Sequence, residues 1–166
     1  MLLVFLVWGK AQSPALQVGD TVPSFRLEDQ DGHLFDLSDY VGKKILVIYF
    51  YPKDESPVCT IEACAFRDDY SRFTQAGALV IGINSGTVQR HKSFHDHQGL
   101  PFVLLSDPQN LVLKRFGVKR SFLFTGRETF VVDLRGKIAF TYSAFTQGEA
   151  HAEKALQVVK QLALPG

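Results

Sequence analysis

Residues 45–67, which read ILVIYFYPKDESPVCTIEACAFR, decide the fold prediction. The run 45–51 is rich in β-branched and aromatic residues, which predicts a buried strand. Pro52 ends this strand because proline has no N–H to donate to a sheet ladder. A short polar loop follows, and apolar residues then recur at the helical positions 63, 66, 70 and 73. The stretch is therefore predicted to form a strand, a loop and an amphipathic helix.

The two cysteines of the chain, Cys59 and Cys64, lie in the first turns of this predicted helix. A free thiol titrates near about 8.5, and only the thiolate form is strongly nucleophilic. Unpaired N–H groups and the dipole at a helix N-terminus stabilise that thiolate. Ser56 offers a hydroxyl that can donate to the thiolate or to a substrate oxygen. The alternative is an inert buried cysteine, and the proline-containing loop before Cys59 speaks against it.

The spacing of the two cysteines indicates a switch. Five residues along an α-helix give about 140° of rotation and roughly 8–9 Å between the two Cα atoms. A disulfide needs a Cα separation within about 7 Å, so Cys59 and Cys64 can bond only after at least one helical turn unwinds. The C-x4-C spacing also differs from the C-x-x-C of thiol–disulfide exchange proteins, and it supplies too few ligands for a zinc site.

The segment YPKDESPVCTIEACAFRD resembles the active-site segment of the peroxiredoxins, specifically the bacterioferritin comigratory protein or peroxiredoxin Q subfamily. The resemblance extends from about Val18 to the C-terminal helix and includes GINSGTVQRHKSF, LPFVLLSD and GRETFVVDLRGKI. Two residues depart from the subfamily pattern. Ser56 replaces the commoner Thr and keeps its hydroxyl, whereas Val58 stands where Gly is usual and is expected to stiffen the loop and narrow peroxide access.

The resemblance implies a thiol-dependent peroxidase that acts on H2O2 or alkyl hydroperoxides. Cys59 matches the peroxidatic cysteine, which becomes a sulfenic acid, and Cys64 matches a resolving cysteine. Their intramolecular disulfide would be reduced by thioredoxin or a similar dithiol. Arg127 matches the arginine that holds the thiolate and polarises the peroxide, while Ser56 donates to the reacting oxygens and Pro52 shields the site from water. The scheme uses no cofactor and no metal, and the subfamily suggests a monomer.

Three competing functions stay open beside the peroxidase. The first is a thiol–disulfide exchange protein, against which the C-x4-C spacing and the pair of Ser56 and Arg127 speak. The second is a redox-regulated holdase or binding module, which predicts that peroxide oxidises the protein no faster than an ordinary thiol. The third treats both cysteines as core filler, in which case Cys59→Ser leaves every activity unchanged.

The remaining segments complete an α/β fold. The order predicted along the chain is a hairpin over 22–37, the strand and helix already described, a strand over 78–84, a helix to about 98, a strand over 101–107, a helix beginning at Pro108, a loop over 119–126, two strands over 128–134 and 137–144, and a helix over 148–163. Alternating strands and helices followed by an antiparallel pair predict a mixed sheet with helices on both faces. The resemblance names this a thioredoxin-like fold with an N-terminal β-hairpin.

The predicted helix before residue 98 carries three histidines. His91 and His95 are spaced i, i+4, which suits metal chelation from one helical face. Neither His97 nor any neighbouring residue supplies an obvious third ligand or an HExxH pattern. We therefore expect a polar, solvated helix surface here and no metal site.

Composition and the N-terminal segment indicate the number of domains and the location of the protein. With 166 residues, 46% hydrophobic content and a net charge of +1, the chain is expected to form one soluble domain over 18–166, with no preference for nucleic acid or an anionic membrane. Residues 1–17 form an apolar extension that is too short for a membrane span and lacks the basic start of a secretory signal. A fragment of a targeting sequence, a start codon assigned too far upstream, and a short strand or docking segment are the three interpretations. A cytoplasmic location is expected, or an exported or organellar one if the extension is a targeting segment.

Overall fold

The computed structural model describes residues 14–120 and 126–164. Most of the apolar extension 1–17, and most of the loop predicted over 119–126, lie outside these described residues. The domain boundary at residue 18 therefore stays a prediction.

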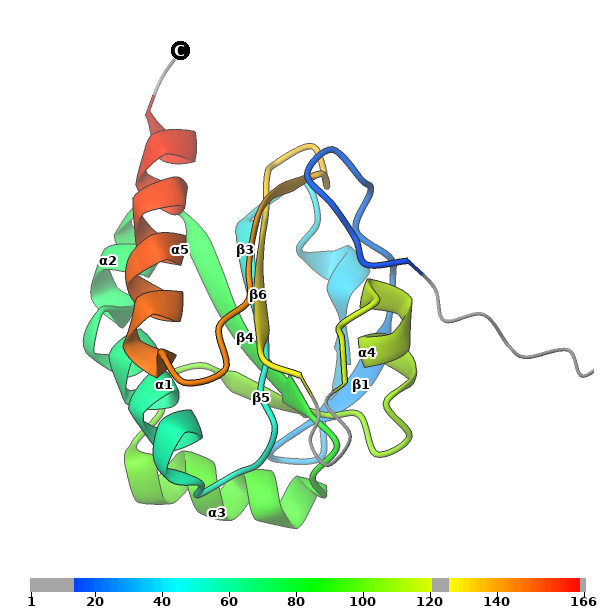
Figure 1. The fold of residues 1–166 in the computed structure, drawn as a ribbon, viewed down its shortest axis with the longest axis vertical. Helices are drawn as coiled ribbons and strands as arrows, with labels where there is room; N and C mark the ends of the chain where they lie inside the picture. Colours follow the sequence, from blue (N-terminus) through cyan, green and yellow to red (C-terminus); the bar gives the residue numbers. More distant parts are fainter. Residues whose placement is uncertain (1–13, 121–125, 165–166) are drawn as a thin grey trace, which may run out of the picture.

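One seven-stranded sheet forms the centre of the molecule, in the order β2-β1-β5-β4-β3-β6-β7 (Figure 1). Its middle strands, β3 (Ile45–Phe50) and β4 (Ala78–Asn84), are parallel to each other. β5 runs parallel to β4, whereas the other neighbours pair antiparallel, so the sheet is mixed, as predicted. The outer strands are β1 (Arg26–Asp29), β2 (Leu34–Asp36), β5 (Val103–Ser106), β6 (Glu128–Val132) and β7 (Ile138–Tyr142).

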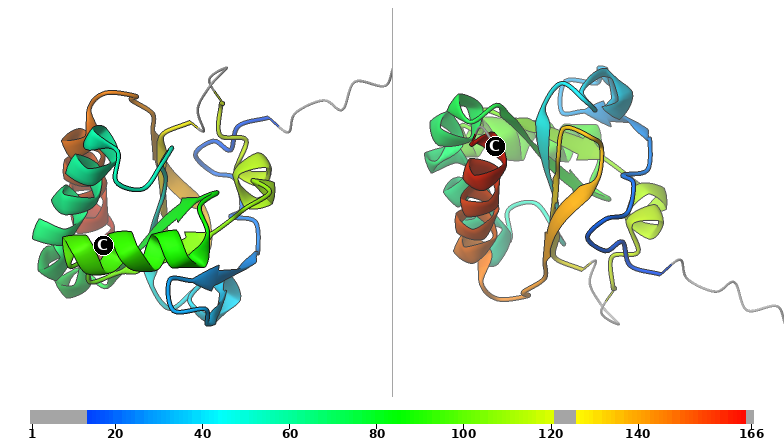
Figure 2. Two further views of the ribbon diagram at one scale, coloured as in Figure 1. Left: turned by 90° about the horizontal axis from the view of Figure 1, so that it is seen from below. Right: turned by 90° about the horizontal axis from the view of Figure 1, so that it is seen from above.

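Helices cover both faces of this sheet. α1 (Pro57–Asp68), α2 (Tyr70–Gln75) and α5 (Gly148–Ala163) gather on one side, and α4 (Leu111–Phe116) lies on the other (Figure 2). α3 (Val88–Gln98) packs against β5 and β1. A short 3-10 helix, Leu37–Asp39, follows the N-terminal hairpin.

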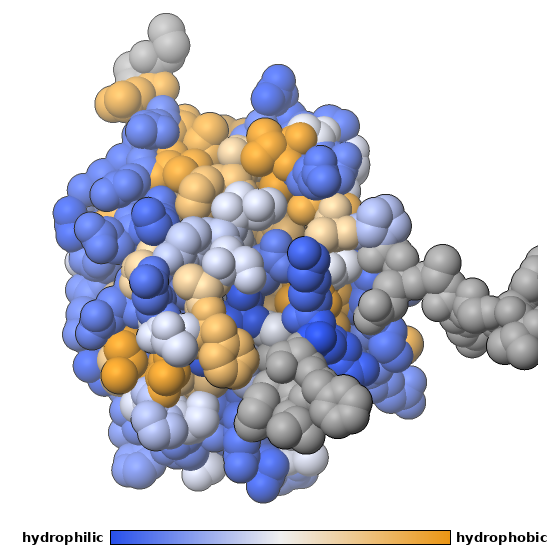
Figure 3. All heavy atoms as spheres, viewed as in Figure 1, coloured by the Kyte–Doolittle hydropathy of each residue, from blue (hydrophilic) through white to orange (hydrophobic). Residues whose placement is uncertain are grey.

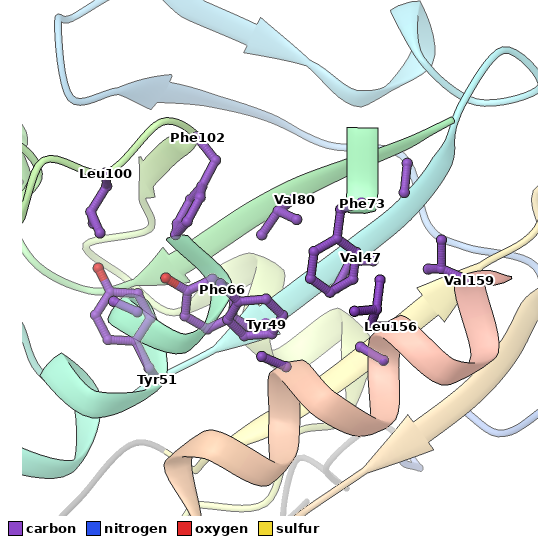
Figure 4. Close-up of a cluster of buried hydrophobic side chains, with 14 of the residues drawn as sticks. Val47, Tyr49, Tyr51, Phe66, Phe73, Val80, Leu100, Phe102, Leu156 and Val159 are labelled. Atoms are coloured by element: carbon purple, nitrogen blue, oxygen red, sulfur yellow. The ribbon is translucent and has the colours of Figure 1, made fainter. Parts of the chain in front are cut away.

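The core lies on both faces of the sheet because side chains alternate along β3. Val47 and Tyr49 point toward the layer of α1, α2 and α5, where they meet Phe66 (Figure 4). Leu46 and Ile48 point to the opposite face and belong to a second buried cluster. A strand that is buried on both faces has a continuous apolar sequence rather than an alternating one, which explains why residues 45–51 contain no polar side chain other than the two tyrosines.

The single helix predicted from the apolar positions 63, 66, 70 and 73 is in fact two helices. α1 ends at Asp68, and Asp69 has φ −95° and ψ 4°, outside the α-helical region. Two consecutive aspartates favour such a break because aspartate has a low helix propensity. Phe66 and Phe73 remain fully buried across the break, so the predicted apolar stripe still reaches the core.

The helix predicted to begin at Pro108 begins later, at Leu111. The Asp107 carboxylate accepts hydrogen bonds from the N–H groups of Leu111 and Leu113, and residues 108–110 form a turn beneath it. Asn110 adopts a left-handed conformation with φ 53°, which a continuous helix from Pro108 would not allow. The hairpin predicted over 22–37 forms over residues 26–36, and the ends of the other predicted strands differ from the observed ones by at most two residues.

Hydrophilic side chains prevail along the helical edge of the face drawn in Figure 3, and apolar side chains gather in separate areas. Ile61 on α1 is one of the exposed large apolar residues. Within the described ranges, no helix combines the length and apolar character that crossing a bilayer requires.

Candidate active site

Cys59 lies in the first turn of α1, at the carboxyl end of β3. Pro57 is the first helical residue and Ser56 is the N-cap, so Cys59 is the third residue of the helix. Its side chain is 1% exposed, and both cysteines are free thiols. The position therefore combines burial with the unpaired N–H groups of a helix N-terminus, which stabilise a thiolate.

Arg127 directly precedes β6 and reaches Cys59 across the end of the neighbouring strand β3. Antiparallel pairing of β6 with β3 places Glu128 opposite Phe50, so the residue before β6 lies beside the carboxyl end of β3. Nη2 of Arg127 donates to Sγ of Cys59 over 3.2 Å. Nε of the same guanidinium donates to the Phe145 carbonyl over 3.1 Å, which fixes the orientation of the buried side chain. The structure thus brings together two residues that are 68 positions apart in the sequence.

Glu62 is a buried acid that sequence reasoning missed. Its Oε2 accepts a hydrogen bond from Nη1 of Arg127, while Oε1 has no hydrogen-bond partner among the described residues. Burial raises the pKa of Glu62 to about 8, although the neighbouring Arg127 acts in the opposite direction. A protonated Glu62 does not neutralise the guanidinium, so the positive charge of Arg127 then acts mainly on the sulfur of Cys59.

His151 of α5 is a second buried polar side chain beside Glu62. Its Nε2 lies 3.0 Å from the Ala144 carbonyl, and its Nδ1 lies 2.8 Å from Oγ1 of Thr129 and 3.5 Å from Oε1 of Glu62. Burial lowers the pKa of His151 to about 4. A neutral ring with its proton on Nε2 satisfies the first two contacts, because Nε2 donates to the carbonyl and Nδ1 accepts from the threonine hydroxyl.

A sequence signal for Glu62 existed but conflicted with the core pattern. Cys59, Glu62, Ala63 and Phe66 fall at i, i+3, i+4 and i+7, which is one face of α1, and all four are buried. An acid on an apolar face requires a cation, and Arg127 supplies it. His151 gave no comparable signal, because nothing in the sequence around it indicates a partner.

Ser56 and Pro52 flank the loop that precedes α1. The Ser56 hydroxyl donates to the Lys53 carbonyl over 3.0 Å and caps no N–H of the helix. Ser56 and Pro52 are both half-buried. The hydroxyl that was expected to serve the sulfur or a substrate oxygen therefore closes a turn of the loop in this structure.

Cys64 is half-buried and lies on the same helix as Cys59, five residues or about one and a half turns further into α1. Its sulfur is 3.6 Å from Oε1 of Gln98, at the end of α3. Arg67 fastens the same part of α1, since its Nη1 donates to the Gln98 carbonyl over 2.8 Å. α1 is continuous from Pro57 to Asp68, so the two cysteines belong to one unbroken helix.

The expectation of a solvated surface for the α3 histidines is wrong for His91. This ring is fully buried, with Nδ1 2.8 Å from the Asp54 carboxylate and Nε2 3.2 Å from the Leu105 carbonyl. His97 is exposed and pairs with Glu55 over 3.1 Å. The single-sequence pattern could not distinguish these histidines, because Asp54 lies 37 residues away on the loop before α1.

Asp29, Asp31 and His33 form the one group of potential metal ligands found among the described residues, with ligand atoms within 4.8 Å of one another. Oδ1 of Asp29 accepts from the N–H groups of Asp31 and His33, so the β1–β2 turn itself accounts for this geometry. The exposed cluster lies in the N-terminal hairpin, away from the α1 residues described above.

A buried thiol held between a helix N-terminus and a guanidinium can exist as a thiolate, and a thioredoxin-like sheet carries it here. This combination is the one expected of a thiol-dependent peroxidase. The chain matches the AhpC/TSA family over residues 18–141, and it belongs to that family.

Individual relatives narrow the family further. The chain is 44% identical over 146 residues to "Peroxiredoxin Q, chloroplastic" of Sedum lineare, which covers 87% of this chain and 78% of the relative. It is 40% identical over 132 residues to "Putative peroxiredoxin bcp" of Coxiella burnetii, with 75% of this chain and 87% of the relative covered. The chain is thus a peroxiredoxin similar to the peroxiredoxin Q and bacterioferritin comigratory proteins.

Solved structures agree with this assignment. Peroxidoxin BcpB from Mycobacterium tuberculosis superposes with a TM-score of 0.83 at 36% identity, covering 89% of this chain and 98% of that one. A mutant of Xylella fastidiosa PrxQ gives a TM-score of 0.82 at 29% identity, covering 92% and 100%. The predicted thioredoxin-like fold is confirmed.

Proposed function

We propose that this peroxiredoxin reduces H2O2 and alkyl hydroperoxides through Cys59 as the peroxidatic cysteine. The observation that carries the proposal is the 3.2 Å contact between Nη2 of Arg127 and the buried Sγ of Cys59 at the start of α1. A cation and a helix N-terminus that act on one sulfur increase its thiolate fraction. The same guanidinium can stabilise the negative charge that develops on the leaving oxygen.

In the first step the Cys59 thiolate attacks the terminal oxygen of the hydroperoxide. The S–O bond forms as the O–O bond breaks, and the leaving oxygen takes up a proton to become water or an alcohol. The sulfur is oxidised to a sulfenic acid. The N–H of Cys59, the hydroxyl of Ser56 and the guanidinium of Arg127 are the proposed donors, with Pro52 excluding water. For this role the Ser56 hydroxyl must leave the Lys53 carbonyl when substrate binds.

In the second step the Cys64 thiol attacks the sulfenic sulfur, and a disulfide and water form. Because both cysteines lie on the unbroken α1, the first turn of that helix must unwind before the two sulfurs can meet. A dithiol of the thioredoxin class then reduces the disulfide by thiol–disulfide exchange. We expect the protein to act as a monomer in the cytoplasm, and an organellar location is the alternative, in line with the chloroplastic relatives.

Peroxide consumption in the presence of reduced thioredoxin tests this function. Thioredoxin, thioredoxin reductase and NADPH should support continuous turnover of H2O2 and of cumene hydroperoxide. Replacing thioredoxin by glutathione should give much slower turnover, because a monothiol must reduce the disulfide in two intermolecular steps. Turnover that persists in Cys59→Ser would contradict the proposal.

A further inference from the structure

Asp54 lies in the loop between β3 and α1, and three side chains meet its carboxylate: one from the start of the same loop, one from β4 and one from α3. Oδ1 accepts from the Tyr51 hydroxyl over 2.7 Å and from Nδ2 of Asn84 over 3.0 Å. Oδ2 lies 2.8 Å from Nδ1 of His91. We call Asp54, Tyr51, Asn84 and His91 the Asp54 cluster. Each of these residues is at most 9% exposed, so the bonds are shielded from water.

The His91 ring in this cluster faces acceptors on both sides. Nδ1 points to the Asp54 carboxylate and Nε2 points to the Leu105 carbonyl of β5. Only an imidazolium ring donates from both nitrogens, so the geometry favours a buried ion pair between His91 and Asp54. Gly86 permits the close packing around this pair, since a Cβ there would lie 2.9 Å from Oδ2 of Asp54 and 3.0 Å from Cε1 of His91.

α3 therefore fastens both parts of the segment that contains the cysteines. Its His91 binds the loop before α1, and its last residue, Gln98, binds the second half of α1 through the side chain of Arg67. Cys64 lies in the second half of α1, where its side chain contacts Gln98 of α3. Cys59 lies in the first turn of α1, three residues after the N-cap Ser56. The first turn can unwind alone only when the loop in front of it is free to move.

We infer that the Asp54 cluster holds the loop before α1 in place, and thereby sets how readily Cys59 leaves the helix to bond with Cys64. Asp54, Tyr51 and His91 are positioning residues in this inference, which rests on the proposed function. The cluster keeps the first turn of α1 formed for the reaction with peroxide. Its strength decides how long the sulfenic acid persists before the disulfide forms.

The two steps should respond unequally to a weaker cluster. If the helical state predominates, a tenfold increase in the unwound population hardly lowers the helical fraction. Disulfide formation draws on the unwound population, so its rate rises with that population, whereas the reaction with peroxide changes little or slows. Loss of one hydrogen bond to a charged group corresponds to a change of about tenfold or more.

The test compares Asp54→Asn with the matched control Asp133→Asn. Asp133 is also 9% exposed, and its carboxylate accepts from the backbone N–H groups of Arg135 and Lys137 in the β6–β7 turn, at the opposite end of β6 from Arg127. Reduced protein is mixed with equimolar H2O2, quenched with acid at intervals, and analysed by mass for sulfenic acid and disulfide. A second series with excess H2O2 measures the sulfinic acid that forms when peroxide reacts again with the sulfenic acid.

We expect Asp54→Asn to form the disulfide about tenfold faster than wild type and to accumulate less sulfinic acid, with no faster reaction toward the first peroxide. Asp133→Asn should match wild type in all three quantities. Tyr51→Phe removes one hydrogen bond to the Asp54 carboxylate and should also speed disulfide formation by about tenfold, which keeps the test decisive if Asp54→Asn does not fold. Equal or slower disulfide formation in these variants, with wild type still reacting rapidly, would overturn this inference alone. Wild-type Cys59 that reacts no faster than a free thiol would instead overturn the proposed function.

Discussion

The sulfur of Cys59 receives stabilisation from two independent sources. Cys59 lies in the first turn of α1, where the helix dipole favours an anion, and Nη2 of Arg127 donates to its sulfur over 3.2 Å. Glu62 shares the same guanidinium, and burial raises the pKa of Glu62 to about 8. Two anions beside one buried cation would be unfavourable, so a protonated Glu62 favours the thiolate of Cys59.

Removing the guanidinium should therefore slow the reaction with peroxide strongly. We expect Arg127→Gln to reduce the second-order rate constant by about 10²–10³, the usual effect of deleting one preorganised donor to a developing negative charge. Arg115→Gln is the matched control, because the side chain of Arg115 donates to the exposed Ser24 carbonyl, has no other hydrogen-bond partner among the described residues, and should be replaceable without loss. Stopped-flow competition with a peroxide-reactive dye measures both constants. Equal rates in the two variants would exclude a catalytic role for Arg127.

Sequence information identified the residues of the site unevenly, for a physical reason. Cys59 could be predicted because a strand, a proline and a helical pattern surround it within a few residues. Arg127 could be assigned through the family resemblance, since an arginine before a strand is most often a surface residue. Glu62 and His91 were missed because each is a buried polar residue whose partner, Arg127 or Asp54, lies far away in the sequence.

At the scale of elements, α1 both places Cys59 in its N-terminal turn and separates it from Cys64. The helix is continuous from Pro57 to Asp68, which places the two cysteines out of bonding range until its first turn opens. Val58 occupies the second position of this turn with helical backbone geometry, so the position does not require the glycine that is usual in the subfamily. Its half-buried side chain lines a cavity of about 340 Å³ together with Ile61 and residues 146–150.

Replacing Val58 should separate helix stability from peroxide access. Val58→Gly weakens the first turn by about 0.5 kcal/mol, since glycine has a lower helix propensity than valine, and should speed disulfide formation about twofold. Val58→Ala removes two of the three side-chain carbons but favours the helix, so it should slow disulfide formation instead. Any faster access of peroxide would appear in both variants. Acid-quench mass analysis gives both rates, and an equal acceleration of disulfide formation by Gly and Ala would contradict the unwinding step.

The elements themselves were largely predictable, and their errors have local causes. The buried strands β3 and β4 were predicted from uninterrupted apolar runs, and α5 was predicted over its observed range. The break at Asp69 and the late start of α4 were not predicted. Both depend on aspartates. Asp69 separates α1 from α2, and the Asp107 carboxylate accepts hydrogen bonds from N–H groups four and six residues further along the chain.

At the scale of the whole molecule, the sheet separates two cores, and three buried titratable groups lie together in one of them. Glu62, Arg127 and His151 all lie between the sheet and the layer of α1 and α5, where water cannot screen them. The free energy of unfolding must then depend on pH, because the folded and unfolded chains bind protons differently. Glu62 and His151 contribute with opposite signs.

The sign for Glu62 follows from its raised pKa. Between about 4.5 and about 8, folded protein retains a proton that the unfolded chain has lost, so the free energy of unfolding falls as pH rises. The slope reaches at most about 1.4 kcal/mol per pH unit. The lowered pKa of His151 gives the opposite slope between about 4 and 6.5, and that contribution is complete above pH 6.5.

Urea unfolding of wild type and Glu62→Gln from pH 6.5 to 8 measures the contribution of Glu62. We expect wild type to lose stability with rising pH more steeply than the variant over this range. The difference between the two slopes isolates Glu62 from the other titrating groups that both proteins share. Parallel curves would show that Glu62 stays ionised throughout and that Arg127 outweighs burial.

The central claim is that the Cys59 thiolate reacts rapidly with peroxide and that Cys64 then forms a disulfide with the resulting sulfenic acid. Single-turnover oxidation tests this claim most directly. Reduced wild type, Cys59→Ser and Cys64→Ser are each mixed with equimolar H2O2, and intact mass and free-thiol count are followed in time. The account predicts rapid loss of two thiols in wild type, a trapped sulfenic acid in Cys64→Ser, and no rapid reaction in Cys59→Ser. Slow oxidation at the rate of an ordinary thiol, equal in all three proteins, would contradict it and favour a redox-regulated binding module.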